Sequence, residues 1–250
     1  MIDEVMMLRH GRTQYNLEHR LQGQIDVPLD IVGQWQVDQT GFALASRYYW
    51  AKVNRLAEHP EAIAQPGPDA AERTDTRQFE EAPAAGRRMV VMTSDLFRAQ
   101  QTAHAFADIL GLPVTCDQRL RERSFGDWEG IPVEELAQRY PEDYRSWAEF
   151  RGGELKYGAE PKEEVGRRGV EALNDWAFRA GSDTDLYVFS HGAWISQTLQ
   201  TLLGMADAHG DFADILSMRN AHWVRLIPLE IGSTLRWRLM DYNHGPAIAD

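Results

Sequence analysis

Short apolar runs alternate along this chain with longer segments whose apolar residues recur at helical spacing. Runs typical of buried strands lie at 5–8, 89–93, 114–116 and 186–189, and two closing strands, as in a hairpin, are predicted at 223–227 and 235–239. Helices are predicted at 31–52, 96–110, within 132–151, at 163–179 and at 193–203. Alternating strands and helices favour a mainly parallel sheet covered on both faces. We therefore expect a three-layer α/β/α sandwich with one antiparallel strand.

Three stretches depart from this alternation and define the expected domain organisation. Residues 13–29 are polar and predict an ordered loop with little regular structure. Residues 57–88 are rich in Ala, Pro, Glu and Asp, and such a composition cannot bury enough surface to offset its ordering entropy. We expect a flexible insertion there, a small cap region at 131–162, and a single domain over residues 1–250.

Composition narrows the partners and the compartment. The chain has 38 acidic against 26 basic residues, and this formal net charge of −12 argues against a nucleic-acid or anionic-membrane surface. No apolar run approaches the ~18–20 residues of a membrane span. The acidic start of the chain does not resemble a signal peptide, and the single cysteine, Cys116, suits a reducing compartment. We expect a cytoplasmic protein without membrane or nucleic-acid partners.

Charged and imidazole side chains follow the predicted strands at the points where they end. Arg9 and His10 follow the first strand, and His191 follows the strand at 186–189. Ser94-Asp95 supplies an N-cap signal for the helix that carries Arg98, and the strand at 114–116 leads toward Glu122. Because the carboxyl ends of parallel strands meet at one edge of a sheet, we expect these side chains to converge.

A site with two histidines, two arginines and one carboxylate suits phosphoryl transfer. Arginine forks bind phosphate oxygens bidentately, and a neutral imidazole is a competent nucleophile near pH 7 because its ordinary pKa is about 6.5. A carboxyl group crowded by phosphate can keep a proton for the departing alkoxide. Positioning and charge compensation from these groups need no metal ion.

Each residue also has a plainer explanation when taken alone. A histidine after a strand is often structural, Arg98 could be solvated, and Glu129 or Asp127 could be confused with Glu122 as the site acid. Arg121 and Arg123 are interpreted as rim charges, and large aromatic residues near the sheet edge as packing residues. Two histidines and a carboxylate could also form a metal triad, although two arginines in the same pocket would repel a divalent cation.

Five ordered sequence blocks resemble the signature of the histidine phosphatase superfamily, which includes the cofactor-dependent phosphoglycerate mutases. The blocks are Leu8-Arg9-His10-Gly11-x-Thr13-x-x-Asn16, Arg20-Leu21-Gln22-Gly23-Gln24-x-Asp26-x-Pro28-Leu29, Ser94-Asp95-Leu96-x-Arg98-Ala99-x-Gln101-Thr102-Ala103, Leu120-x-Glu122-x-x-Phe125-Gly126-x-Trp128-Glu129-Gly130 and Ser190-His191-Gly192. Arg-His-Gly alone is a weak signal, whereas five blocks in the family's order are a strong one. The resemblance implies the family's α/β/α fold.

The resemblance also implies a role for each matching residue. His10 would be the nucleophile that becomes phosphohistidine, and Glu122 would be the proton donor and later the base for water. The phosphate-binding residues it implies are Arg9, Arg98, His191 and Asn16, with His191 counted among the catalytic residues as well. Gln22 and Gly23 match the substrate-contacting loop. Arg12 departs from the family pattern, because an acidic residue is frequent there, and it predicts a more basic pocket rim.

We therefore expect a metal-independent phosphomonoesterase with no cofactor that acts on a small phosphorylated metabolite. The alternatives are phosphoglycerate mutase-type transfer and a non-catalytic binder of phosphorylated ligands. Mutases resembling this family carry Trp-Asn in the first block and a longer insertion over the phosphoenzyme. Here Tyr15-Asn16 stands instead and the segment from 130 to 162 is short, which favours hydrolysis. The sequence allows a homodimer, and it leaves the oligomeric state and the substrate open.

Overall fold

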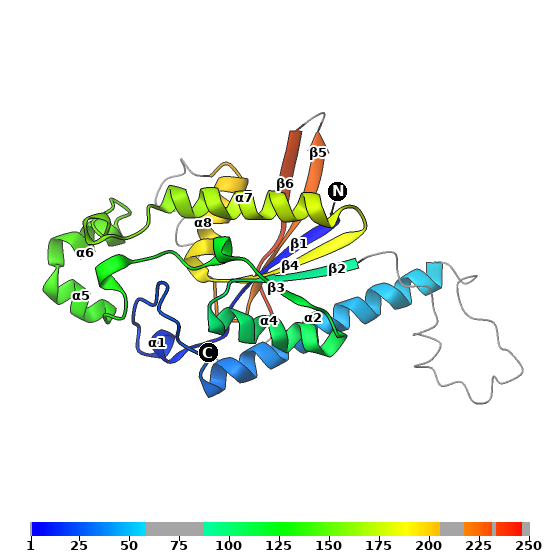
Figure 1. Cartoon of the computed structure of the whole chain (residues 1–250), viewed down its shortest axis with the longest axis horizontal. Coiled ribbons are helices and arrows are strands. Elements are labelled where there is room, and N and C mark those ends of the chain that lie inside the picture. The colour runs from blue at the N-terminus through cyan, green and yellow to red at the C-terminus, as the bar shows by residue number, and fades with distance from the viewer. Residues whose placement is uncertain (1, 59–87, 206–217, 232–233, 247–250) are drawn as a thin grey trace, which may run out of the picture.

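A six-stranded sheet lies between two layers of helices in the computed structural model, which describes residues 2–58, 88–205, 218–231 and 234–246 (Figure 1). The strands are β1 (Glu4–Arg9), β2 (Arg88–Thr93), β3 (Val114–Cys116), β4 (Thr184–Ser190), β5 (Trp223–Ile231) and β6 (Thr234–His244). The helices are α1 (Gln14–Leu17), α2 (Ile31–Glu58), α4 (Phe97–Leu110), α5 (Val133–Arg139), α6 (Pro141–Ala148), α7 (Lys162–Ala180) and α8 (Gly192–Leu202). Short 3-10 turns are η3 (Gln118–Leu120), η4 (Gly126–Trp128) and η5 (Leu155–Tyr157).

The strand order is β3-β2-β4-β1-β5-β6, so β4 lies between two strands that precede it in the sequence. The pairs β2–β3, β2–β4 and β1–β4 are parallel, whereas β5 runs antiparallel to both β1 and β6. The expected mainly parallel sheet with one strand running against it is confirmed. The closing strands pair as predicted, and both are longer than their apolar runs because the hairpin pairs beyond them.

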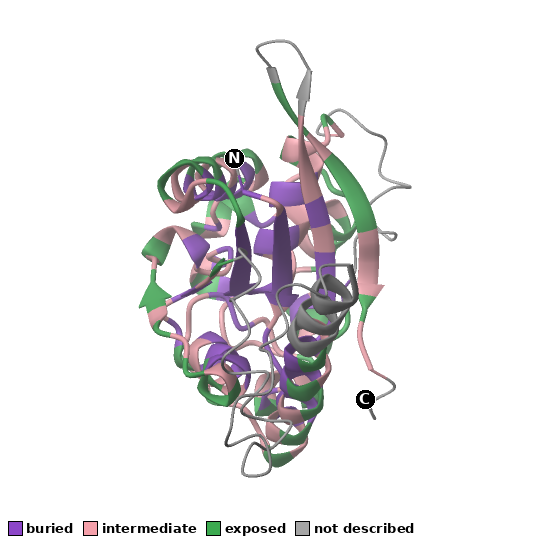
Figure 2. Cartoon of the chain, turned by 90° about the vertical axis from the view of Figure 1, so that its right-hand side faces the viewer, coloured by how far each residue is buried: buried purple, intermediate pink, exposed green. Residues whose placement is uncertain are grey.

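Alternation along the central strands divides the core between the two helical layers. Val5 and Met7 belong to the cluster packed with α7 and α8, whereas Met6 and Leu8 belong to the cluster packed with α2 and α4. All four are fully buried, and Figure 2 shows the strands at the centre of the sheet in the purple of buried residues. Burial on both faces explains why β1 is a continuous apolar run. Each such side chain contributes ~1.5–3 kcal/mol.

The stretch 13–29 has little regular structure, as expected, apart from the four-residue helix α1, where the Asn16 N–H donates to the Thr13 hydroxyl in a capping box. One local expectation was wrong. Ser94-Asp95 does not cap α4, whose N-cap is Leu96 without a side-chain hydrogen bond. The Asp95 carboxylate pairs instead with Arg121, at 2.7 Å from its Nε.

The structure describes the expected cap region but little of the expected insertion. Of residues 57–88, all but the end of α2 and the start of β2 lie outside the described residues. Residues 131–162 contain α5, α6 and η5, which pack on an aromatic cluster centred on Phe125, Trp128 and Leu136 and separate from the two sheet cores. In the described part of the chain, no helix is both long enough and apolar enough to cross a membrane.

Candidate active site

Two imidazoles meet at the carboxyl edge of the sheet because β1 and β4 are neighbours. The pairing of Arg9 with Ser190 places the next residues, His10 and His191, side by side, and their ring centroids are 5.2 Å apart. Both histidines are buried. Gly11 keeps the turn after His10 close to α2, because a Cβ there would lie 2.6 Å from the Gly33 carbonyl oxygen.

His10 is held as a neutral imidazole with one defined tautomer. Its Nδ1 lies 2.7 Å from the Gly11 carbonyl oxygen, which can only accept, so Nδ1 carries the proton and Nε2 keeps its lone pair. Burial lowers the pKa of His10 well below its ordinary value, and the charges of Arg98 and Arg9 lower it further. At neutral pH the ring therefore presents an unprotonated nitrogen, as a nucleophile requires.

Unpartnered buried nitrogens surround His10. Among the described residues, no hydrogen-bond partner is found for the Nε atoms of Arg9 and Arg98 or for either ring nitrogen of His191. Other Arg98 nitrogens donate to the carbonyls of Ile25 and Gly23, each at 2.8 Å, which ties the loop before α2 to the site. Burial lowers the pKa of Arg98 to about 10 and lowers the pKa of His191 well below its ordinary value. Such a concentration of donors fits an anion with several oxygens.

Glu122 lies in the loop after η3, against the N-terminus of α8, and lines the same pocket. Its Oε1 accepts hydrogen bonds from the backbone N–H groups of Arg123 (2.8 Å) and Trp194 (2.9 Å), and its Oε2 accepts from Ala193 (3.2 Å). The rival acid Glu129 is bound elsewhere, because its Oε1 accepts from the N–H groups of Gln24 and Phe125. Of these two acids, only Glu122 lines the pocket.

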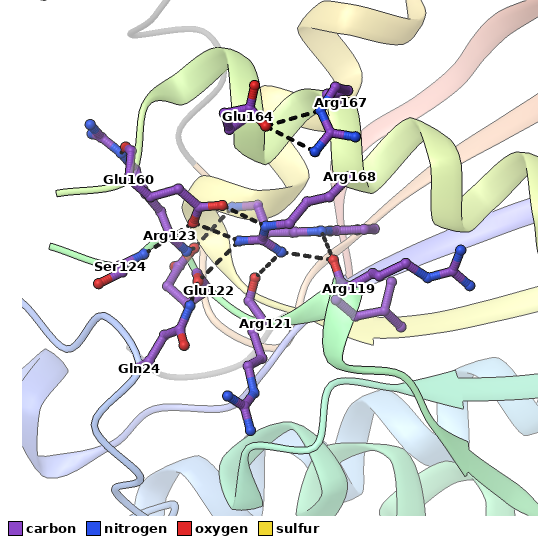
Figure 3. Close-up of polar contacts among 12 residues, drawn as sticks. Gln24, Arg119, Arg121, Glu122, Arg123, Ser124, Glu160, Glu164, Arg167 and Arg168 are labelled. Atoms are coloured by element: carbon purple, nitrogen blue, oxygen red, sulfur yellow. Dashed lines mark hydrogen bonds and ion pairs between the residues drawn. The ribbon is translucent and has the colours of Figure 1, made fainter.

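A guanidinium from α7 fixes the loop that carries Glu122 (Figure 3). Arg168 donates to the carbonyls of Arg119 and Arg121, both at 2.7 Å, and to the carbonyl of Glu122 at 3.1 Å. It also pairs with the Glu160 carboxylate through Nε (2.8 Å) and Nη2 (3.0 Å). These five hydrogen bonds join α7, Glu160 two residues before it, and the segment from η3 to Glu122 in one rigid arrangement.

The remaining predicted site residues lie around the same pocket. Asn16, Gln22 and Gly23 line it together with Arg9, His10, Arg98 and Glu122. Gly23 has a positive φ of 51°, and a Cβ there would meet the Glu129 carboxylate at 2.0 Å, so glycine is required at this turn.

Asn220, which follows the undescribed residues 206–217, was not predicted from the sequence. Its Nδ2 donates to the His10 carbonyl at 3.0 Å and to the Asn16 Oδ1 at 3.2 Å. It therefore joins the backbone of the nucleophile to a predicted phosphate ligand. A lone asparagine outside the five blocks gave no signal that could have identified it.

Two expectations about the pocket rim were wrong. Arg12 is not among the residues that line the pocket, because its Nε pairs with Asp30 at 2.8 Å. Arg123 lines the pocket but is not an exposed rim charge. It is 2% exposed and pairs with the buried Glu154 at 2.7 Å. Trp128 and Trp194 are fully buried packing residues, whereas Phe125 lines the pocket.

The fold and the site together define a class of protein. A neutral buried histidine with one free ring nitrogen, flanked by two arginines at the carboxyl edge of a mainly parallel sheet, is suited to phosphoryl chemistry. A profile described as "Histidine phosphatase superfamily (branch 1)" matches residues 5–66 and 69–238. The chain belongs to the histidine phosphatase superfamily.

Relatives named as phosphatases or mutases match between 81% and 100% of this chain. A glucosyl-3-phosphoglycerate phosphatase of Mycolicibacterium vanbaalenii is 28% identical over 100% of this chain and 98% of its own length. A probable phosphoglycerate mutase, GpmB, of Yersinia enterocolitica is 31% identical over 81% of this chain and 75% of its own length. A solved mycobacterial glucosyl-3-phosphoglycerate phosphatase superposes with a TM-score of 0.72 at 24% identity, over 96% of this chain and 98% of that one. The last likeness confirms the fold.

Proposed function

We propose that this protein is a metal-independent phosphomonoesterase that hydrolyses a small phosphorylated metabolite through a phosphohistidine on His10. The observation that carries the proposal is the hydrogen bond between His10 Nδ1 and the Gly11 carbonyl, which leaves Nε2 as the free nucleophilic nitrogen between Arg9 and Arg98. The phosphatase names of several relatives over the full chain length support hydrolysis.

In the first step, Nε2 of His10 attacks phosphorus and the bond from phosphorus to the substrate oxygen breaks. Glu122 gives a proton to the departing oxygen, so the product leaves as a neutral alcohol. Arg9, Arg98 and His191 hold the phosphoryl oxygens while charge moves across them, and Asn16 adds an amide donor. These charge-assisted contacts strengthen in a buried site from which water is largely excluded.

In the second step, the ionised Glu122 takes a proton from a water molecule, which attacks phosphorus as the bond from phosphorus to Nε2 breaks. Inorganic phosphate leaves, and His10 recovers its neutral imidazole. Backbone N–H groups already donate to both oxygens of Glu122, which fixes its position for receiving and returning that proton.

Mutase chemistry is the second candidate, because the GpmB relatives carry that name. Hydrolysis is favoured by Tyr15, which stands where the mutases have a tryptophan. It is also favoured by the short segment of residues 131–162, which we propose is a small cap region within a single domain. Incubation with 3-phosphoglycerate and a trace of 2,3-bisphosphoglycerate separates the candidates. Formation of 2-phosphoglycerate without phosphate release would establish the mutase.

The central experiment measures phosphate release from para-nitrophenyl phosphate and from a metabolite panel that begins with glucosyl-3-phosphoglycerate, with and without EDTA. The wild-type enzyme should turn over in both conditions, because the two arginines beside His10 disfavour a bound cation. His10→Ala should lose turnover and acid-labile phosphoenzyme together. Unchanged hydrolysis by this variant would refute the mechanism, and inhibition by EDTA would refute metal independence.

One further proposal concerns the protein as a whole. We propose a cytoplasmic location on the strength of the single exposed cysteine, Cys116, which cannot form an intrachain disulfide. The oligomeric state is open between a monomer and a homodimer, and light scattering on the purified chain distinguishes them.

A further inference from the structure

The candidate active site is one part of a pocket far larger than a phosphoryl group. The pocket has a volume of about 1030 Å³ and reaches from the strand ends to α6, the start of α7 and one face of α8. The α8 face contributes polar uncharged side chains at Ser196, Gln197, Gln200 and Thr201. The aromatic residues that line the pocket are Phe125, Tyr144, Trp147 and Phe150. The substrate therefore has room for much more than its phosphate.

Lys162 lines this pocket. It is half-buried, and its Nζ lies 4.2 Å from the centroid of the Phe150 ring. Among the described residues no carboxylate lies within 4.0 Å of that ammonium group. Burial lowers the pKa of Lys162, and the charge of Arg123 lowers it further. The charges of Glu154 and Glu163 act in the opposite direction, yet neither carboxylate lies within ion-pair distance of the ammonium group.

The acids around Lys162 are engaged elsewhere or open to solvent. Glu154 pairs with Arg123 at 2.7 Å, and both side chains are buried. Glu149 forms an ion pair with Arg151, and Glu163 is exposed to solvent. Glu154 and Glu163 act on Lys162 only at longer range, and none of these three carboxylates lies within 4.0 Å of its ammonium group.

Helix stability does not explain the position of Lys162 either. It is the first residue of α7, where the partial positive charge of the helix end disfavours a cation. Burial and the helix dipole both disfavour a cation here, and the charge of an anionic ligand would offset these costs.

We propose that Lys162 binds a second anionic group of the substrate, a carboxylate or a second phosphate. This inference rests on the proposed function, because the first anionic group is the phosphoester at His10. The polar face of α8 lies along the pocket and suits hydroxyl groups between the two charges, and Phe150 holds the ammonium group in place. The substrate class is a hydroxylated metabolite with a phosphoester at one end and a second anion at the other.

The test compares Lys162→Met with wild type on matched substrates. The probes are glycerol 3-phosphate, whose remainder is neutral, 3-phosphoglycerate, which adds a carboxylate, and 2,3-bisphosphoglycerate, which adds a second phosphate as well. Wild type should prefer at least one of the latter two substrates over glycerol 3-phosphate. For that substrate, the kcat/KM relative to the kcat/KM for glycerol 3-phosphate should fall at least tenfold in Lys162→Met, mainly through a higher KM. Lys156→Met is the control, because Lys156 is exposed and pairs with Asp143 at 2.7 Å, and it should keep the wild-type ratio.

The outcomes separate the two levels of inference. A fall for 3-phosphoglycerate, with or without one for the bisphosphate, would identify a carboxylate, and a fall confined to the bisphosphate would identify a phosphate. Unchanged ratios in Lys162→Met, or no wild-type preference for either added anion, would overturn the role of Lys162 while leaving phosphatase activity intact. A loss of folding stability in Lys162→Met would point to a structural role, whereas the helix-end charge predicts a melting temperature equal to or above wild type. Failure of wild type to hydrolyse para-nitrophenyl phosphate would refute the proposed function itself.

Discussion

Replacing Arg168 with lysine should loosen the loop that carries Glu122 from α7 while keeping a positive charge on that helix. Arg168 makes five hydrogen bonds, to three carbonyls and to both oxygens of Glu160. A lysine ammonium has three donors, so at least two of these bonds are lost. Each lost hydrogen bond should cost ~1.5 kcal/mol, the low end for bonds to charged groups, because Arg168 and Glu160 keep some exposure. The free energy of unfolding should therefore fall by ~3 kcal/mol.

The catalytic effect should be selective for poor leaving groups. A displacement of Glu122 on the order of 1 Å costs ~10²-fold where its proton is needed. An alkyl phosphate needs that proton, whereas para-nitrophenolate leaves readily without it. The assay is kcat/KM for both substrates, because that ratio reports the phosphorylation step. We expect the alkyl phosphate to lose ~10²-fold and the aryl phosphate far less.

The matched control is Arg167→Lys, one residue earlier on the same helix. Arg167 is exposed and pairs only with Glu164 and Glu171 on α7 among the described residues, so its replacement should change stability by ~0.5 kcal/mol or less and leave both activities unchanged. An unaltered ratio of alkyl to aryl activity in Arg168→Lys, with both reduced in proportion to the folded fraction, would refute the positioning role.

Three further predictions follow from the site. Glu122→Gln should lower steady-state turnover of an aryl phosphate by ~10²–10⁴-fold and let phosphohistidine accumulate, which intact-mass spectrometry detects; a fall in turnover without phosphoenzyme would contradict its role as base. Because the pKa values of His10 and His191 are lowered in the folded protein, the unfolded chain binds more protons below about pH 6.5. As the pH is lowered through that range, the free energy of unfolding measured with urea should fall by up to ~1.4 kcal/mol per pH unit for each histidine. His191→Asn should reduce this slope. Asn220→Ala should weaken kcat/KM about tenfold, since losing one such hydrogen bond costs ~1–2 kcal/mol, and kinetics equal to wild type would exclude it from positioning His10.

The sheet and the convergence of the strand-end residues were predictable because they follow from local patterns. A run such as Val5–Leu8, apolar at every position, can only be buried on both faces, and polar residues after such strands must lie at the sheet edge. Strand order was not predicted, because periodicity does not state which strands are neighbours.

What the sequence did not reveal are contacts that depend on three-dimensional pairing. Arg12 and Arg123 have the same charge, and only the structure shows that Asp30 and Glu154 neutralise them. Arg168 has no motif, and its importance arises because three carbonyls of a distant loop face one helix. Long-range partners of this kind leave no spacing signal in a single chain.

The place of β4 in the sheet has a consequence for biosynthesis. β4 inserts between β1 and β2, both of which leave the ribosome long before it. Until residue 190 has emerged, the facing edges of β1 and β2 stay unpaired, and an unpaired apolar edge is a template for aggregation. The same insertion brings His191 next to His10, so a nascent chain that stops before β4 has neither a continuous sheet nor a complete phosphate site. Protection from aggregation and the assembly of the active site are therefore one late event.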